Sequence, residues 1–195
     1  WSKIKLDGRQ VAGEQGMTFL HVSSLVQQKN VDRIFDAFAL SRKPRDRLLI
    51  GGPCPRDPKL LRRMAREVGV NYLGRLSRAG LKMALAESDV FVHPSLADGW
   101  AMTVTEALGA GLSVVSSPMT GAADYYHTLW QKKDPTVGPI HLVDPLSHVA
   151  IAEGMRAARV TAGRRNQESF AVLIGWPHSS KILFQVVREN GDKDV

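Results

Sequence analysis

The sequence predicts an α/β fold in which a parallel sheet carries helices on both faces. Short apolar segments that suit buried strands alternate with segments whose apolar residues recur at helical spacing. Glycine turns separate them, and Gly69 and Gly111 lie where helices are expected to end. Strands that alternate with helices pair in parallel through right-handed crossovers, so ligands are expected outside the carboxyl ends of the strands.

The predicted elements follow one another between residues 17 and 160. After the first strand, the i, i+3, i+4, i+7 spacing of a helix is kept by Val31, Ile34, Phe35 and Phe38. Ser77 is placed to cap a later helix. We expect strands at residues 17–23, 48–50, 71–73, 90–92, 112–116 and 140–143. We expect helices at residues 31–38, 57–68, 77–87, 101–108, 121–130, 147–160 and 179–189, the fifth of them short.

The composition is that of one ordinary globular domain. A chain of 195 residues with 44% hydrophobic and 23% charged residues is long enough to bury a full core. We expect residues 1–16 to be a linker or trimmed boundary and residues 17–160 to form the domain. Residues 161–195 are expected to be a C-terminal extension with a terminal helix.

The net charge of +7 favours anionic partners such as nucleic acid, an acidic membrane or a phosphorylated small molecule. Much of the excess lies between Arg42 and Arg66, where it fits a solvated face of an amphipathic helix. This region lacks interleaved aromatic residues, so nucleic-acid binding is not expected.

Two features bear on the compartment. No apolar run approaches the roughly 18 to 20 residues that span a bilayer, and the first residues lack the apolar core of a signal peptide. The single Cys54 cannot form an internal disulfide, which fits a reducing compartment. A cytoplasmic location is therefore the simplest expectation.

The most informative stretch reads HPSLADGWAMTVTEALGAG and places Asp98 and Glu106 on either side of a glycine turn and a helix start. Free backbone N–H groups at such a helix start suit an anion, and the carboxylates suit sugar hydroxyls. Thr103-x-x-Glu106 also fits a capping box, in which the glutamate only bonds back to the backbone. The residues alone leave both interpretations open.

This stretch resembles the donor-binding motif of the GT-B-fold retaining glycosyltransferases of family four, the group 1 glycosyltransferases. In that motif an acidic residue precedes a Gly-Phe-Gly-like turn, and a glutamate follows eight positions later; Asp98 and Glu106 keep this spacing. Residues 17–160 follow the family's C-terminal domain in order, through the segments HVSSLVQQKNVDRIFDAFAL, LLIGGP, YLGRLSRAGLKMALAESDVFVHPS and VVSSPMTGAADYY. The resemblance implies a Rossmann-like, nucleotide-sugar-binding half of a GT-B fold, with the acceptor-binding N-terminal domain missing from this chain.

The resemblance also implies roles for single residues. Lys29 would grip the donor diphosphate and share catalysis with Asp98, which would touch the transferred sugar. Glu106 would accept hydrogen bonds from the ribose, and backbone groups around Leu76 would face the base. The full set of implied donor-binding residues is Ser24, Lys29, Leu76, Asp98, Gly99, Trp100, Ala101, Met102, Thr103 and Glu106.

The chain departs from the family pattern at two of these positions. Ser24 stands where the family has an arginine, and Asp98 stands where it has a glutamate, one methylene longer. Trp100 replaces the usual phenylalanine and could stack on a sugar or serve packing alone. His21, on an apolar strand, is expected to be a satisfied core residue, whereas the role of His93 stays open.

The implied activity is retaining transfer of a sugar from a nucleoside diphosphate to an unknown acceptor, with inactivity expected for this fragment alone. The nucleotide sugar is then the substrate, and no separate cofactor is expected. No metal is expected either, because no His or Cys pair has ligand spacing. Peripheral membrane association of the full-length protein is compatible with this interpretation. The alternative, motivated by Ser24 and Asp98, is a catalytically decayed GT-B-like binding or scaffolding domain.

Overall fold

The computed structural model describes residues 16–133 and 138–162 of the 195-residue chain. Its elements are β1 (Thr18–Val22), the 3-10 helix η1 (Gln27–Lys29), α1 (Val31–Ser41), β2 (Arg47–Gly51), α2 (Pro58–Arg66), β3 (Val70–Gly74), α3 (Arg78–Ala86), β4 (Val90–His93), α4 (Met102–Gly109), β5 (Ser113–Ser116), α5 (Gly121–Lys133), β6 (Ile140–Leu142) and α6 (His148–Ala162). Residues 1–15 of the expected linker and the helix expected at 179–189 lie outside the described residues.

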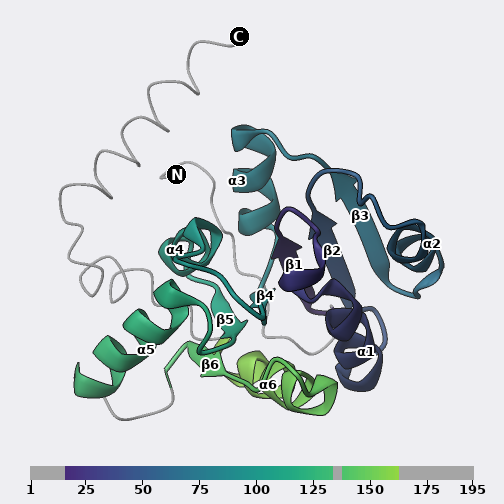
Figure 1. The fold of residues 1–195 in the computed structure, drawn as a ribbon. Helices are drawn as coiled ribbons and strands as arrows, with labels where there is room; N and C mark the ends of the chain where they lie inside the picture. Colours follow the sequence, from purple (N-terminus) through teal and green to yellow (C-terminus); the bar gives the residue numbers. More distant parts are fainter. Residues whose placement is uncertain (1–15, 134–137, 163–195) are drawn as a thin grey trace, which may run out of the picture.

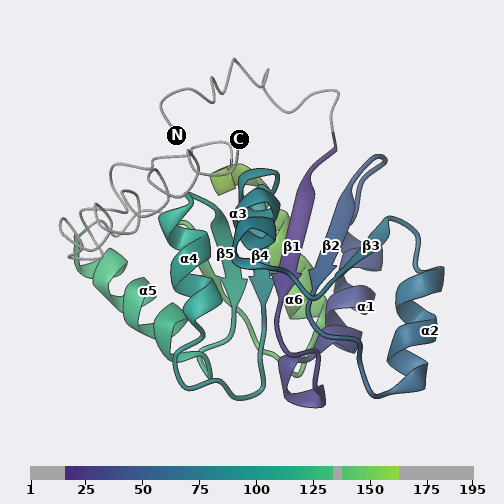
Figure 2. The same ribbon diagram turned by 90° about the horizontal axis from the view of Figure 1, so that it is seen from above.

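The described strands form one parallel sheet in the order β3-β2-β1-β4-β5-β6. The order reverses between β1 and β4, which is where doubly wound folds of this kind bind their ligands. All five strand pairs are parallel, so the carboxyl ends of the strands share one edge, as the labelled strands in Figure 2 show. The predicted α/β fold with a parallel sheet is confirmed.

Helices cover both faces of the sheet, as predicted (Figure 1). One core cluster joins the sheet to α1, α2 and α6 and includes the fully buried Ile34 and Met155. The other joins it to α3, α4 and α5 and includes the fully buried Leu108. Helix α5 continues past the predicted end at Trp130 to Lys133.

The basic helix α2 uses one of its arginines to pack against α1. Arg63 bonds Asp32 at 3.2 Å and also pairs with Asp36, while its guanidinium lies 5.3 Å from the centre of the Phe35 ring. Arg62 beside it is exposed. The exposed Arg62 and Arg66 agree with the predicted amphipathic helix whose basic side faces water, whereas Arg63 pairs with α1 instead.

A largely buried ion pair connects the end of α6 to the start of the sheet. Asp46 accepts hydrogen bonds from the N–H groups of Met17 (2.8 Å) and Lys43 (2.6 Å) and pairs with Arg159. The Arg159 guanidinium also lies 5.1 Å from the centre of the Phe19 ring. Burial alone would raise the pKa of Asp46, but the hydrogen bonds from Arg159, Lys43 and Met17 outweigh it and hold the pKa below its ordinary value.

We expect Asp46→Ala to lower the free energy of unfolding by about 3 to 5 kcal/mol, because it leaves Arg159 unpaired in a largely buried position. Since the folded-state pKa of Asp46 is depressed, the stabilisation is present above the unfolded pKa. It is lost as the pH falls through the folded value. Urea unfolding at pH 7 and in acid measures both effects. The exposed Asp32→Ala is the control and should cost no more than about 1 kcal/mol.

Candidate functional site

The carboxyl ends of β1 and β4 bring a lysine, a carboxylate and a histidine together. Asp98 Oδ2 lies 2.5 Å from Lys29 Nζ and 2.9 Å from His93 Nε2. The Lys29 and Asp98 side chains are only 17% and 18% exposed, so water screens the pair much less than a surface ion pair. The two residues that the sequence assigned to catalysis are thus in direct contact.

Asn30 fixes the loop that carries Lys29. Its backbone is left-handed, with φ at 63°, a conformation that Asn adopts more readily than most residues. Its side-chain amide donates to the carbonyls of Pro94, after β4, at 2.9 Å and of Pro145, after β6, at 2.7 Å. The Gln28 carbonyl in turn accepts from the loop after β4. Three loops of the ligand-binding edge are therefore joined through one buried side chain.

The charges in the cluster shift the titration of both Asp98 and His93. Burial would raise the pKa of Asp98, but hydrogen bonds from Lys29 and His93 outweigh it and keep the pKa below its usual value. Burial lowers the pKa of His93 despite the neighbouring Asp98 carboxylate. At neutral pH the cluster therefore contains an ionised aspartate, a lysine and a neutral histidine.

His21 behaves as the core residue that the sequence predicted. It is fully buried, and its ring nitrogens lie 2.8 Å from the Val92 carbonyl and 2.8 Å from Ser23 Oγ. Burial lowers the pKa of His21 to about 3. Its ring stacks on that of His93, so it supports the cluster without reaching Asp98.

The start of α4 leaves backbone N–H groups free for an anion. Its N-cap, Ala101, has a left-handed φ of 60° and no capping side chain, and Thr103 lies inside the helix. The capping-box interpretation of Thr103 and Glu106 is therefore wrong. Within the described part of the chain, no acceptor bonds the N–H groups of Gly99, Trp100, Ala101, Met102 and Thr103. The predicted C-terminal stop is confirmed, with Gly111 at φ 79° and its N–H 2.9 Å from the Leu108 carbonyl.

Glu106 lies half-buried one turn further along α4. Burial raises the pKa of its carboxyl group, and Arg78 at the start of α3 opposes this. Among the described residues, none donates a hydrogen bond to this carboxylate. Arg78 follows the turn that contains Leu76, which packs against Gly51. Glu106 and the turn expected to face a base thus lie on neighbouring helix starts.

Trp100 serves packing in this structure. Its ring centre lies 5.6 Å from that of Tyr125 and 6.0 Å from that of Tyr126, both on α5. A Cβ on Gly121 would lie 2.1 Å from the Gly99 carbonyl oxygen, so this glycine lets the start of α5 approach the turn after Asp98.

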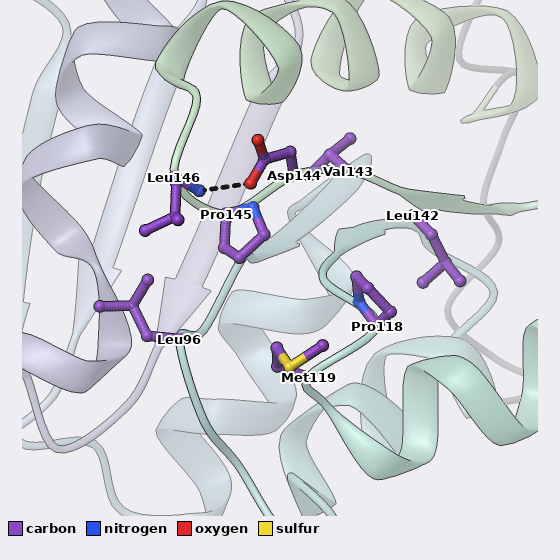
Figure 3. A pocket seen from close by; sticks show the side chains of 8 residues that line it. All are labelled: Leu96, Pro118, Met119, Leu142, Val143, Asp144, Pro145 and Leu146. Carbon is purple, nitrogen blue, oxygen red and sulfur yellow. Dashed lines mark hydrogen bonds between the residues drawn. The ribbon is translucent and has the colours of Figure 1, made fainter.

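Figure 3 shows the residues around an open pocket of about 760 Å³. It connects to the cluster through Met119 in its wall, whose carbonyl accepts the Asp98 N–H at 3.0 Å. Its lining is mostly apolar and consists of Leu96, Pro118, Met119, Leu142, Val143, Asp144, Pro145 and Leu146. One carboxylate oxygen of Asp144 accepts a hydrogen bond from the Leu146 N–H, at 2.9 Å.

The described residues contain no group of three or more His, Cys, Asp or Glu side chains that could hold a metal ion. Nor does any helix within them have the length and apolar character needed to cross a membrane.

The sequence of residues 16–158 matches the family model described as Glycosyl transferases group 1. The chain belongs to this family. The resemblance found in the sequence is therefore confirmed, although no curated protein sequence matches the chain.

Solved structures of glycosyltransferases share the fold of this group 1 chain. A UDP-forming α,α-trehalose-phosphate synthase from Burkholderia xenovorans has a TM-score of 0.61 and 19% identity, over 83% of this chain and 40% of that chain. Sucrose-phosphate synthase from Thermosynechococcus elongatus has a TM-score of 0.61 and 22% identity, over 91% of this chain and 46% of that chain. The catalytic domain of cholesterol-α-glucosyltransferase from Helicobacter pylori has a TM-score of 0.63 and 20% identity, over 82% of this chain and 98% of that chain. The chain thus spans less than half the length of the first two proteins.

The family pattern is altered where the chain has Ser24. The side chain of Ser24 is exposed and takes no part in the cluster around Asp98. Arg56 and Arg75, which could replace the family's arginine, are exposed and also lie outside that cluster. His93, by contrast, is a member that the sequence left unassigned. The available signal was a histidine at the end of a strand, five residues before Asp98.

We expect Asn30→Ala to destabilise the fold by about 2 to 3 kcal/mol, because it removes the two hydrogen bonds that the amide donates and the one that it accepts from Arg33. It also leaves the buried carbonyl of Pro94 and the partly buried carbonyl of Pro145 without their donor. Thermal or urea unfolding measures the loss. Asn30→Gly is the matched variant, since it removes the same amide but favours the left-handed backbone. If Asn30→Ala is as stable as the wild type, the amide does not join these loops.

Proposed function

We propose that this chain is the nucleotide-sugar-binding domain of a retaining glycosyltransferase, which moves a sugar from a nucleoside diphosphate to an acceptor. The observation that carries the proposal is the contact between Lys29 and Asp98 at the carboxyl ends of β1 and β4, in a chain of the group 1 family. A cation for phosphate and a carboxylate for hydroxyls lie side by side at the point where the strand order reverses.

The diphosphate is proposed to bind between Lys29 and the start of α4. A lysine acts on phosphate as a point charge, and the free N–H groups of residues 99–103 add the partial positive charge of a helix start. These groups support an anion site that needs no metal ion. The bound anion would compete with Asp98 for Lys29.

The nucleoside is proposed to lie toward α3 and α4. Glu106 has a half-buried carboxylate that no described side chain uses, and a ribose offers it two hydroxyl donors. Leu76 lies in the turn just before α3, whose first residue, Arg78, interacts electrostatically with Glu106. The backbone around Leu76 would therefore face the base.

The proposed chemical contribution is electrostatic. Lys29 and the start of α4 would stabilise the negative charge that develops on the leaving diphosphate, and Asp98 would accept a hydrogen bond from the transferred sugar. Transfer on the same face of the sugar would leave the anomeric configuration unchanged. The nucleotide sugar would be the substrate, without a separate cofactor.

An acceptor-binding domain outside these residues completes the proposal, because the chain spans only 40% and 46% of two structural relatives. The fragment alone would then bind donor and turn over little. A cytoplasmic location and peripheral membrane association of the full-length protein remain predictions.

A second candidate is a binding or scaffolding domain whose transferase site has decayed. It is favoured by Ser24, which is exposed and uncharged where the family has an arginine. The loss of such a forked donor would cost on the order of 1.5 to 3 kcal/mol of diphosphate affinity. Transfer by the full-length protein would exclude decay, whereas donor binding without turnover in the full-length protein would support it.

We expect calorimetric titration to show weak binding of at least one nucleoside diphosphate sugar among uridine, guanosine and adenosine donors. Binding should weaken in Lys29→Met, which removes the charge but keeps an unbranched side chain. The loss should be on the order of tenfold, the equivalent of about 1.4 kcal/mol. No binding of any of the three classes by the wild type would contradict the proposed function.

Glu106→Ala should weaken nucleotide binding about tenfold or more, because one carboxylate would accept two ribose hydroxyls. The melting temperature should change little, since no described group bonds this carboxylate. Glu153→Ala, an exposed glutamate on α6, is the control and should alter neither property. A large drop in melting temperature with unchanged affinity would mean that Glu106 is structural.

A further inference from the structure

His93 is the buried partner of Asp98. It is the last residue of β4 and only 1% exposed, and its Nε2 lies 2.9 Å from Asp98 Oδ2. The same carboxylate oxygen is paired with Lys29 at 2.5 Å. No described residue donates a hydrogen bond to the other oxygen, Oδ1. The carboxylate is thus held at one oxygen and left available at the other.

The packing around His93 keeps its ring in one orientation. The ring stacks against those of His21, 5.5 Å away at 17°, and Phe91, 6.0 Å away at 12°. Its backbone carbonyl accepts from the Ser95 N–H at 2.9 Å and from Ser116 Oγ at 2.8 Å. A donor mounted on this ring therefore has little freedom to follow the carboxylate or to turn away from it.

The hydrogen bond assigns the tautomer of His93. A carboxylate only accepts hydrogen bonds, so Nε2 carries the proton that points at Asp98. Nδ1 is buried and has no partner among the described residues. Burial lowers the pKa of His93, which agrees with a neutral ring that has its one proton on Nε2. His93 is therefore a buried neutral donor at a strand end, whereas Lys29 is a charged donor from the loop after β1.

In the proposed function, Lys29 has two competing binding partners, the Asp98 carboxylate and the donor diphosphate. In the structure it pairs with Asp98, and a bound diphosphate would draw the same ammonium group away. Asp98 would then keep a largely shielded negative charge without its cation. An aspartate left in this way would turn toward water and lose its orientation toward the sugar.

We propose that His93 is a positioning residue for donor-sugar recognition, which holds Asp98 Oδ2 in place when Lys29 engages the diphosphate. Oδ1 then remains directed to accept a hydrogen bond from a hydroxyl of the transferred sugar. The inference rests on the proposed function and adds a division of labour to it: Lys29 serves the phosphates, and His93 serves the sugar through Asp98.

The test compares a nucleoside diphosphate with its sugar conjugate, using the base that the wild-type chain binds best. In His93→Leu the nucleoside diphosphate should bind within about threefold of wild type, and the sugar conjugate about tenfold more weakly, as for the loss of one hydrogen bond to a charged group. His93→Gln, whose amide N–H can occupy the place of Nε2, should recover most of the loss. His93→Phe keeps the ring stack and replaces the leucine variant if that variant does not fold.

His141→Leu is the matched control, because it also removes a histidine from a strand. The His141 ring bonds Thr161 at 2.9 Å and makes no hydrogen bond to Asp98. It should leave the ratio of the two affinities unchanged. Nitrogen NMR of the labelled imidazole provides a readout without ligand, and His93 should show a protonated Nε2 and a bare Nδ1.

The outcomes separate the two proposals. If the wild type binds none of the nucleotides, the proposed function fails and the role of His93 fails with it. If the wild type binds them and His93→Leu keeps the wild-type ratio of affinities, only the role of His93 is overturned. A proton on Nδ1, or equal losses for both ligands, would also overturn that role.

Discussion

The site depends first on the side-chain amide of Asn30. Its two hydrogen bonds reach the carbonyls after β4 and after β6, so the loop of β1 cannot move independently of either. The left-handed backbone of Asn30 directs the chain from η1 into α1 and leaves Lys29 facing Asp98. A left-handed backbone is a property that asparagine and glycine share. In this chain the residue supplies the turn and also a bond that glycine cannot make.

The second constraint is the balance of charge at Asp98. One oxygen of this carboxylate satisfies both a lysine and a buried histidine, and the remaining oxygen is left without a described donor. The positive charge of Lys29 and the negative charge of Asp98 therefore already compensate each other within the site. In the proposed function, a diphosphate that binds Lys29 has to displace Asp98, so its net gain in binding free energy is the difference between two contacts with the same ammonium group. This competition predicts modest affinity without any appeal to a damaged site.

The sequence predicted the architecture because the fold is set by patterns that lie close together in the chain. Helical spacing in residues 31–38 and the glycine stop at Gly111 are local, and both are found as expected. Helix α5 exceeded its predicted length and runs to Lys133, and its Tyr125 and Tyr126 pack against Trp100, a contact between separate elements that the sequence does not reveal. The capping box failed for a related reason: the motif matched in spacing, but the backbone places the helix start at Met102.

The prediction of the site shows the same division. Matching to the family placed Lys29 and Asp98 among the candidate site residues, yet their direct contact and the contact of Asp98 with His93 needed coordinates, since 69 positions separate the two ion-pair partners. The structure also shows what the shorter side chain at position 98 contacts. The family's glutamate is one methylene longer, whereas the aspartate of this chain has its carboxylate beside the ring of His93, which packs against His21 and Phe91. Aspartate keeps the charge within 2.9 Å of that ring. The short side chain at position 98 thus places its carboxylate against a buried donor, and the proposed role of His93 depends on this contact.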